Sequence, residues 1–88
     1  MRDAVIVSTA RTPLTKAARG AFNNTTGATL GAFSIKAAVE RAGLEGGEID
    51  DVVMGTAAQQ GSTGGNVARL AALRAGLPVT VPAMTIDR

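Results

Sequence analysis

Residues Asp51–Ile86 read DVVMGTAAQQGSTGGNVARLAALRAGLPVTVPAMTI, and this stretch decides the fold that we expect. It opens with the short apolar run Asp51–Gly55 and closes with a second run, Val81–Ile86. Short apolar runs that contain β-branched residues are typical of strands buried in a parallel sheet. Between them, Val67–Ala75 repeats apolar residues at helical spacing, and Asn66 stands before it as a candidate N-cap. The stretch therefore predicts a strand, a helix and a second strand.

The residues before this unit show the same alternation. Ala4–Val7 is a continuous apolar run that predicts a further strand, and Thr29–Ala42 has a wide apolar helical face. Thr26 or Thr29 is a candidate N-cap for that helix. The polar segment Ser8–Gly27 is long for a connection, and connections of that length are often functional. The order strand, helix, strand, helix, strand predicts an α/β fold with a mostly parallel sheet and right-handed crossovers.

The tetrapeptide RAGL occurs twice, at Arg41–Leu44 and Arg74–Leu77, 33 residues apart. A period of this length can mark a helical solenoid. However, the residues around the two copies do not otherwise match, and each copy precedes an apolar run. We interpret both copies as helix ends, in which Gly43 and Gly76 adopt the left-handed conformation and the next leucine makes the accompanying hydrophobic contact. Pro78 prevents the second helix from continuing.

Length and composition indicate a part of a larger core. Eighty-eight residues allow at most one small domain, which buries a modest share of its surface. Hydrophobic residues make up 45% of the chain, but many are alanines and the only aromatic residues are Phe22 and Phe33. The chain has no Cys and no His, so it lacks disulfides, thiolate metal ligands and the commonest acid–base group at neutral pH. We therefore do not expect a free-standing mini-protein.

The charges argue against a nucleic-acid partner. Nine basic residues stand against seven acidic ones, the basic residues are scattered, and there is no Tyr or Trp on which bases could stack. No apolar run approaches the roughly 20 residues that span a bilayer, and Ala4–Val7 is too short for the core of a signal peptide. We expect a cytoplasmic protein with neither a nucleic-acid nor a membrane partner.

Ligands bind beyond the carboxyl ends of the strands in open parallel sheets, which directs attention to three segments. These segments are Thr9–Pro13, Thr56–Gly65 and Asp87–Arg88. They contain hydroxyl groups but no histidine to act as a base. A pair of Ser8 and Lys16 is conceivable, although nothing in the sequence fixes its geometry.

Two features of these segments have alternative interpretations. The glycine-rich stretch Gly61–Asn66 could bind an anion at a helix N-terminus. It lacks both the Lys-Ser/Thr of a P-loop and the G-x-G-x-x-G spacing, so we favour a role in tight turning. Arg11 could bind a phosphate or carboxylate. We favour an anchoring role for it, together with Thr12 and Pro13, through carbonyl groups of its own loop or through Asp87.

Longer stretches of the chain resemble a known family. Met1–Pro13 (MRDAVIVSTARTP) resembles the opening of the thiolases, which comprise acetyl-CoA acetyltransferases and 3-ketoacyl-CoA thiolases. Gly31–Leu44, Val52–Gly55 and Asn66–Pro78 (NVARLAALRAGLP) continue the match. Val81–Arg88 (VPAMTIDR) resembles the strand that leads into the catalytic cysteine of that family. No single motif is decisive, but the similarity is collinear over essentially the whole chain.

The resemblance implies that residues 1–88 are the first part of the N-terminal domain of a three-layer α/β/α fold, whose remainder lies downstream or in another chain. Thiolases transfer acyl groups between an acyl-cysteine and coenzyme A, and interconvert 3-ketoacyl-CoA with acyl-CoA plus acetyl-CoA in fatty acid metabolism. The nucleophilic cysteine is then expected about two positions after Arg88, where a helix N-terminus favours the thiolate. The activating histidine and the second cysteine come later still. No catalytic, cofactor-binding or metal-binding residue is therefore expected in this span, and acyl-CoA is a substrate of the whole enzyme only.

The resemblance also implies structural roles. Arg11, Thr12 and Pro13 match the strand-exit motif of the family, and Asp87 and Arg88 match the lead-in to the nucleophile. Asp87 stands where many thiolases have Asn. The last predicted strand resembles the one that pairs across the thiolase dimer, which implies a homodimer or homotetramer with an interface formed by Val81, Ala83, Met84, Thr85 and Ile86.

Two hypotheses about function stay open. The chain is a segment of an acyl-CoA acyltransferase, or it is a stand-alone small α/β binding or interaction module without catalysis. The first predicts an exposed apolar sheet edge and helix face in the isolated chain, and the second predicts a monomer that unfolds cooperatively. We favour the first, because the sequence stops at Arg88, shortly before the expected nucleophile. The acyl chain length, and the choice between a biosynthetic and a degradative role, stay open.

Overall fold

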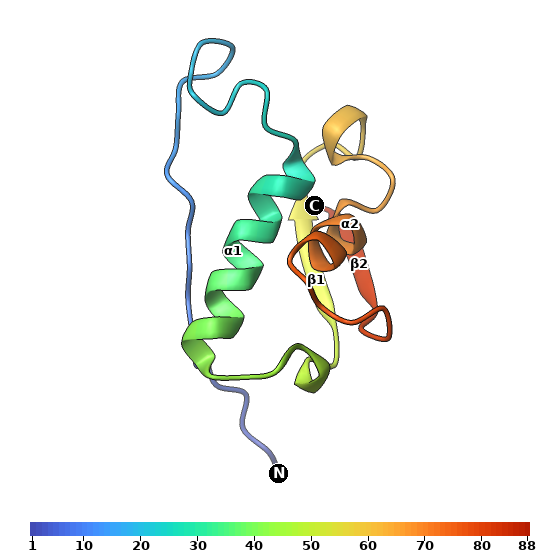
Figure 1. The fold of residues 1–88 in the computed structure, drawn as a ribbon. Coiled ribbons are helices and arrows are strands. Elements are labelled where there is room, and N and C mark those ends of the chain that lie inside the picture. The colour runs from blue at the N-terminus through green and yellow to red at the C-terminus, as the bar shows by residue number, and fades with distance from the viewer.

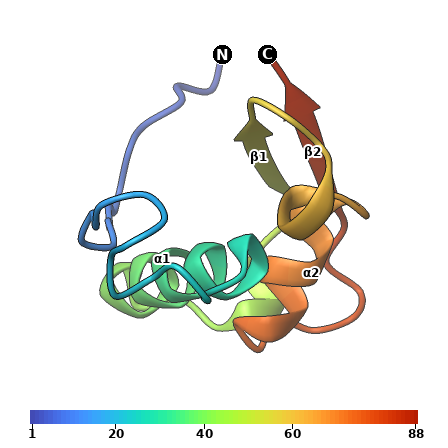
Figure 2. The ribbon, with the colours of Figure 1, turned by 90° about the horizontal axis from the view of Figure 1, so that it is seen from above.

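The computed structural model describes residues 1–88 and contains two helices and two strands. In chain order the elements are α1 (Gly27–Ala42), the 3-10 turn η1 (Gly46–Glu48), β1 (Val52–Thr56), the 3-10 turn η2 (Gly61–Thr63), α2 (Val67–Arg74) and β2 (Ala83–Asp87). β1 and β2 form a parallel pair, α2 packs on one face of this pair, and α1 packs against α2 (Figures 1 and 2). Neither helix combines the length and the apolar character needed to cross a membrane.

The C-terminal ends of both helices form as the sequence predicts, and α1 begins at Gly27, two residues before the predicted start at Thr29. Thr26 is the residue that caps α1, because its hydroxyl accepts a hydrogen bond of 3.3 Å from the Thr29 amide. Gly43 then ends α1 with φ 71°, and the Leu44 amide donates back to the Val39 carbonyl at 3.3 Å.

The second RAGL copy repeats this geometry at the end of α2. Gly76 has φ 91°, and the Leu77 amide donates to the Ala72 carbonyl at 3.1 Å. Both copies are therefore helix ends of the same type, with a left-handed glycine and a following leucine. The solenoid interpretation is wrong, because the first copy lies before β1 and the second copy lies between β1 and β2, which pair in parallel.

Small residues form the centre of the structure. Four of the eight buried residues belong to α2, namely Val67, Ala68, Ala71 and Ala72. Gly31 of α1 faces this helix so closely that an added Cβ would lie 2.9 Å from the Met54 Cε atom and 3.1 Å from the Ala71 Cβ atom. Leu77 and Val81 extend the core beyond α2. The alanine-rich sequence therefore gives close approach of the elements but little buried volume.

The first predicted strand does not form. Val5, Ile6 and Val7 are 73%, 86% and 71% exposed, and no residue of Ala4–Val7 makes a backbone hydrogen bond. The segment runs extended along α1, where the Arg41 Nη1 atom donates to the Thr9 carbonyl at 2.8 Å (Figure 1). An apolar run is a local signal, whereas a strand also needs a neighbour for its N–H and C=O groups. The observed order is therefore helix, strand, helix, strand.

The two strands that do form start or end one or two residues away from the predicted bounds. β2 begins at Ala83 rather than Val81, because Pro82 has no N–H to give to the ladder. The Pro82 carbonyl instead accepts from the Val52 amide at 3.1 Å and starts the pairing of the strands. On the face away from α2, Val53 and Met84 are 55% and 50% exposed, so residues 1–88 supply only one of the two helical layers of the expected three-layer fold.

Candidate functional site

The carboxyl ends of β1 and β2 define one edge of the molecule. Thr56 and Asp87, the last residues of the two strands, are opposite each other in the parallel ladder. The segments Thr56–Gly65 and Asp87–Arg88 therefore leave the sheet side by side, as the sequence predicts. Thr9–Pro13 does not join them, since the segment before it lies along α1 outside the sheet (Figure 2). Two of the three predicted exits are thus brought together.

A polar network connects β2 to the first turn of α2. The Thr85 hydroxyl donates to the Asn66 Oδ1 atom at 2.7 Å and accepts from the Ala68 amide at 3.0 Å. The Asn66 Nδ2 atom donates to the Ala83 carbonyl at 3.0 Å. Asn66 occupies the N-cap position as predicted, but its side chain makes no capping hydrogen bond. The capping bond to the second amide of the helix comes from Thr85 instead.

The reason lies in the backbone of Asn66. Its φ of 56° and ψ of 68° are left-handed, whereas a capping Asn normally has an extended backbone. Asn tolerates this conformation better than most residues that have a Cβ. Because the side chain bonds β2 rather than the helix, one of the free amides of α2 is left for a group on the neighbouring strand.

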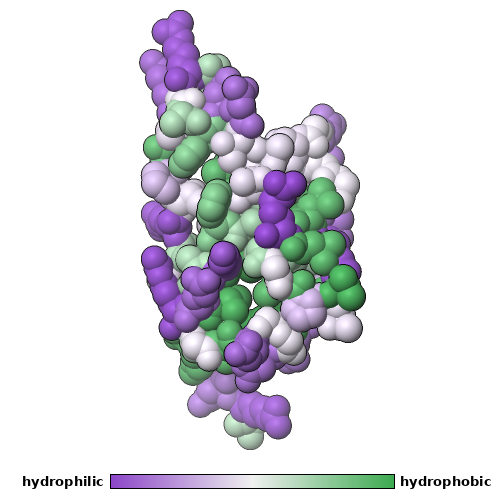
Figure 3. Space-filling model, viewed as in Figure 1, coloured by the Kyte–Doolittle hydropathy of each residue, from purple (hydrophilic) through white to green (hydrophobic).

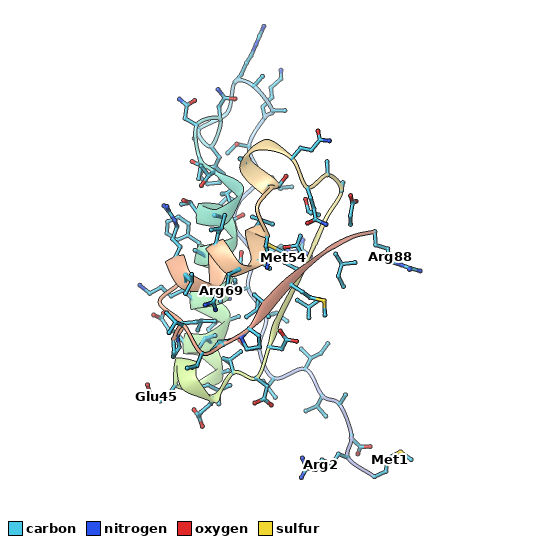
Figure 4. The ribbon with its side chains drawn as sticks, turned by 90° about the vertical axis from the view of Figure 1, so that its right-hand side faces the viewer. Met1, Arg2, Glu45, Met54, Arg69 and Arg88 are labelled. Atoms are coloured by element: carbon cyan, nitrogen blue, oxygen red, sulfur yellow. The ribbon has the colours of Figure 1, made fainter.

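Arg69 holds the chain just before β2. Its Nη1 atom donates to the Val81 carbonyl at 2.5 Å and its Nη2 atom donates to the Val79 carbonyl at 2.8 Å. Figure 4 shows Arg69 on α2, while Arg88 lies at the far end of β2. The planar guanidinium suits two acceptors at once. The first turn of α2 thus holds residues 79–85 at several successive points.

The glycine-rich stretch acts as a compact turn. Gly61 and Gly65 have φ values of 58° and 65°, a conformation that favours glycine. The Thr63 hydroxyl donates to the carbonyl groups of Ala58 and Gln60, which closes the loop on itself. These contacts agree with the interpretation as a tight turn, and α2 receives its capping group from Thr85.

Arg11, Thr12 and Pro13 lie in the long segment before α1. The Arg11 side chain is exposed, while Thr12 is half-buried. The three residues line a cavity of about 390 Å³ together with Phe22 and Phe33, the two aromatic residues of the chain. The hydrogen bond that ties this segment to the helix comes from Arg41 rather than from Arg11. The anchoring role of Arg11 stays a prediction.

The remaining candidates contribute no reactive group. The Ser8 hydroxyl is buried without a hydrogen-bond partner, so the conceivable pair with Lys16 does not form. No three carboxylates gather where they could hold a metal ion. The described site is therefore a polar scaffold at the sheet edge where β2 ends at Asp87.

The residues predicted for a subunit interface lie on or before β2. Val81 is buried at 2% exposure, whereas Met84 and Ile86 are 50% and 39% exposed on the outer face. β2 pairs with β1 on one side only. Its second edge is therefore free of strands within this chain, and the interface itself stays a prediction.

Comparison with known proteins identifies the family. Residues 4–88 match the family model described as "Thiolase, N-terminal domain". The chain belongs to the thiolase family. It is 46% identical over 88 residues to a 3-ketoacyl-CoA thiolase of Bacillus subtilis and 49% identical over 88 residues to an acetyl-CoA acetyltransferase of Cupriavidus necator. Each alignment covers 100% of this chain and 22% of the relative.

The thiolase match confirms the family that the sequence resembles and extends over nearly all of its residues. The chain spans about a fifth of the length of the curated relatives that it matches. A peroxisomal 3-ketoacyl-CoA thiolase of Arabidopsis thaliana is 41% identical over 86 residues, with 19% of that protein covered.

Sequence reasoning missed two contributors to this thiolase segment. Thr85 was assigned to an interface, although its hydroxyl also caps α2, and Arg69 received no role. The one local signal was the left-handed tendency of the Gly65–Asn66 dipeptide, which turns the Asn side chain away from its own helix. The partner residue could not be read from the sequence, because it lies 19 positions away from Asn66.

Proposed function

We propose that the protein containing this segment is an acyl-CoA acyltransferase. It cleaves 3-ketoacyl-CoA with coenzyme A, and catalyses the reverse condensation, through an acyl-cysteine intermediate. The observation that carries the proposal is the match of residues 4–88 to the thiolase N-terminal domain. The names of the relatives, 3-ketoacyl-CoA thiolase and acetyl-CoA acetyltransferase, support the same activity.

In this proposal residues 1–88 build the scaffold and leave the chemistry to the rest of the protein. The chain contains neither Cys nor His, so it has no thiolate nucleophile and no imidazole base. β2 ends at Asp87, next to the loop that follows β1. The nucleophilic cysteine would follow Arg88 by about two positions and would be activated at the start of a helix.

We propose further that the protein is a homodimer or homotetramer that uses β2 at its interface. The unpaired edge of β2 and the exposed side chains of Met84 and Ile86 support this assignment. An unpaired strand edge is a template for pairing with another strand. A cytoplasmic location and a role in fatty acid metabolism belong to the same proposal. Cell fractionation distinguishes this location from the peroxisomal one named for the Arabidopsis relative.

The test begins with the intact mass of the protein purified under denaturing and reducing conditions. The segment has a mass of 8.8 kDa, which at 22% of the relatives' length corresponds to a whole protein of about 40 kDa. We expect a species of that size, or a segment of 8.8 kDa that copurifies with a larger partner. A species of 8.8 kDa alone in a soluble, folded sample would instead support a binding module.

The activity assay then follows the consumption of acetoacetyl-CoA in the presence of coenzyme A, and the formation of acetyl-CoA. We expect turnover that is lost after treatment with iodoacetamide, because alkylation removes a nucleophilic thiolate. A protein of full length that shows no turnover with 3-ketoacyl-CoA substrates of any chain length would overturn the proposed function.

A further inference from the structure

The Asn66–Thr85 pair connects β2 to the start of α2 through side-chain hydrogen bonds. The ladder with β1 fixes the register of β2, with Thr85 opposite Met54. Apolar packing between the two elements includes small side chains, since Ala83 of β2 packs against a cluster that contains Ala72 of α2. Apolar contacts of this kind are not directional, whereas hydrogen bonds require defined distances and angles. The polar bonds therefore set the position of β2 over α2.

The bonds of the pair act close to the end of the strand. Arg69 holds the Val79 and Val81 carbonyls before β2 begins, and the Asn66 side chain holds the Ala83 carbonyl at 3.0 Å. The Thr85 hydroxyl makes the last of these contacts. Only Ile86 and Asp87 separate it from the end of the strand. A shift at Thr85 is therefore carried directly into the exit of the chain at the sheet edge.

We propose that Asn66 and Thr85 are a positioning pair, which sets the place and direction in which the chain leaves β2 toward the reactive cysteine. This inference rests on the proposed function, because the cysteine lies outside residues 1–88. Neither residue is assigned a contact with substrate. Their effect passes through β2 to the residue that follows it.

The pair is suited to this role because each member has several partners. The Thr85 hydroxyl uses its donor and an acceptor at the same time, on Asn66 and on the Ala68 amide. Replacing the hydroxyl by a methyl group removes both bonds with little change in volume. Displacements of about 1 Å at a reacting group can reduce turnover by about 100-fold. We therefore expect Thr85→Val to reduce kcat by between about 10-fold and 100-fold.

The test uses the full-length protein with four single variants and the double variant of Thr85→Val and Asn66→Gly. Thr85→Val removes the hydroxyl and Thr85→Ser retains it. Asn66→Gly removes the side chain while glycine accepts the left-handed backbone. Thr80→Val is the matched control, because Thr80 is an exposed threonine shortly before β2 and lies outside the network of Asn66 and Thr85. All variants are assayed for acetoacetyl-CoA thiolysis at a temperature well below their melting temperatures.

Two readouts separate positioning from stability. The first is the division of the effect between kcat and KM, and the second is the pH dependence of the rate at which iodoacetamide alkylates the reactive cysteine. We expect Thr85→Val and Asn66→Gly to lower kcat with little change in KM, and to move the alkylation profile toward higher pH. Thr85→Ser and Thr80→Val should behave as the unmodified protein. Because the two residues form one network, the double variant should lose little more than either single variant.

Each outcome decides one question. An unmodified protein without turnover overturns the proposed function, whatever the variants do. An active unmodified protein whose Thr85→Val and Asn66→Gly variants keep its kcat and alkylation profile, even with lowered melting temperatures, overturns the positioning role. If Thr85→Val does not fold, Asn66→Gly alone decides between these outcomes. Loss of activity in Thr85→Ser equal to that in Thr85→Val also contradicts the role, since the hydroxyl is still present.

Discussion

The isolated 88-residue chain should not fold into a cooperative, soluble monomer. Its accessible surface is 6547 Å². A compact protein of 8.8 kDa is expected to expose about 4,800 Å², so the chain exposes about 1,800 Å² more than its mass predicts. This excess is larger than the roughly 800 Å² that each partner contributes to a standard protein interface. The radius of gyration, 13.6 Å, likewise exceeds the value of about 12 Å expected for this length.

Much of the excess surface is apolar. Val5, Ile6 and Val7 are exposed along the N-terminal segment, and Val53 and Met84 are exposed on the outer face of the sheet. Figure 3 shows further apolar surface on the side of the molecule where α2 lies. Only eight of 88 residues are buried, and six of these are alanine or valine in the two helices. The hydrophobic contribution of this core is small compared with the conformational entropy of ordering the chain.

The assay compares the isolated chain with the same residues in the full-length protein. We expect the isolated chain to bind a hydrophobic dye, to associate in size-exclusion chromatography, and to show a broad thermal transition. Its Val52–Thr56 amides should exchange rapidly, whereas they should be protected in the full-length protein. Mixing the isolated chain with the remainder of the protein should restore protection, because the remainder covers the excess surface.

A matched variant tests the reasoning about surface. Replacing Val53 and Met84 by threonine keeps β-propensity while it lowers the apolar area of the outer sheet face. This variant should be more soluble than the unmodified chain, but its unfolding should stay broad, because the core is unchanged. A monomeric isolated chain with a sharp, two-state unfolding transition would refute this reasoning and favour the stand-alone module.

Two further predictions concern single residues in the full-length protein. Gly76→Ala should reduce the free energy of unfolding by about 1 to 2 kcal/mol, since φ is 91° and no atom lies within 4 Å of an added Cβ, so only backbone strain acts. The control is Gly47→Ala, because Gly47 has equally open surroundings but no positive φ. The melting temperature of Gly76→Ala should be lower than that of the unmodified protein, and that of Gly47→Ala should not. Equal melting temperatures of the two variants would contradict the prediction. Arg11→Ala should act through stability, with a lowered melting temperature and an unchanged kcat, because Arg11 is predicted to anchor its loop. A large loss of turnover at an unchanged melting temperature would exclude that role.

Most of the features that the sequence predicted correctly are local ones. A left-handed glycine followed by leucine ends a helix through bonds within the last turn, so both RAGL copies could be interpreted without knowledge of the fold. The Thr26 cap reaches an amide three residues away, which is equally local. The parallel pairing of β1 and β2 followed from a helix between two apolar runs, a unit for which few topologies exist.

The features that the sequence did not predict depend on distant partners. Ala4–Val7 has the composition of a strand, but a strand requires a ladder partner, and the segment lies along α1 instead. The local pattern therefore does not specify which groups pair with the backbone N–H and C=O groups of this run. The prediction for the cap of α2 was wrong for the same reason, because an Asn before a helix was expected to cap that helix.

Thr85 caps α2 in place of Asn66, and this affects how this part of the chain folds. α2 has eight residues, and helices shorter than about 12 residues are marginal in water. Its second amide is satisfied by Thr85, which lies beyond the end of the helix, on a strand that is itself held by Asn66. Neither α2 nor β2 therefore completes its hydrogen bonds without the other. The helix and the strand should form together, as one unit that already directs the chain to the edge of the sheet.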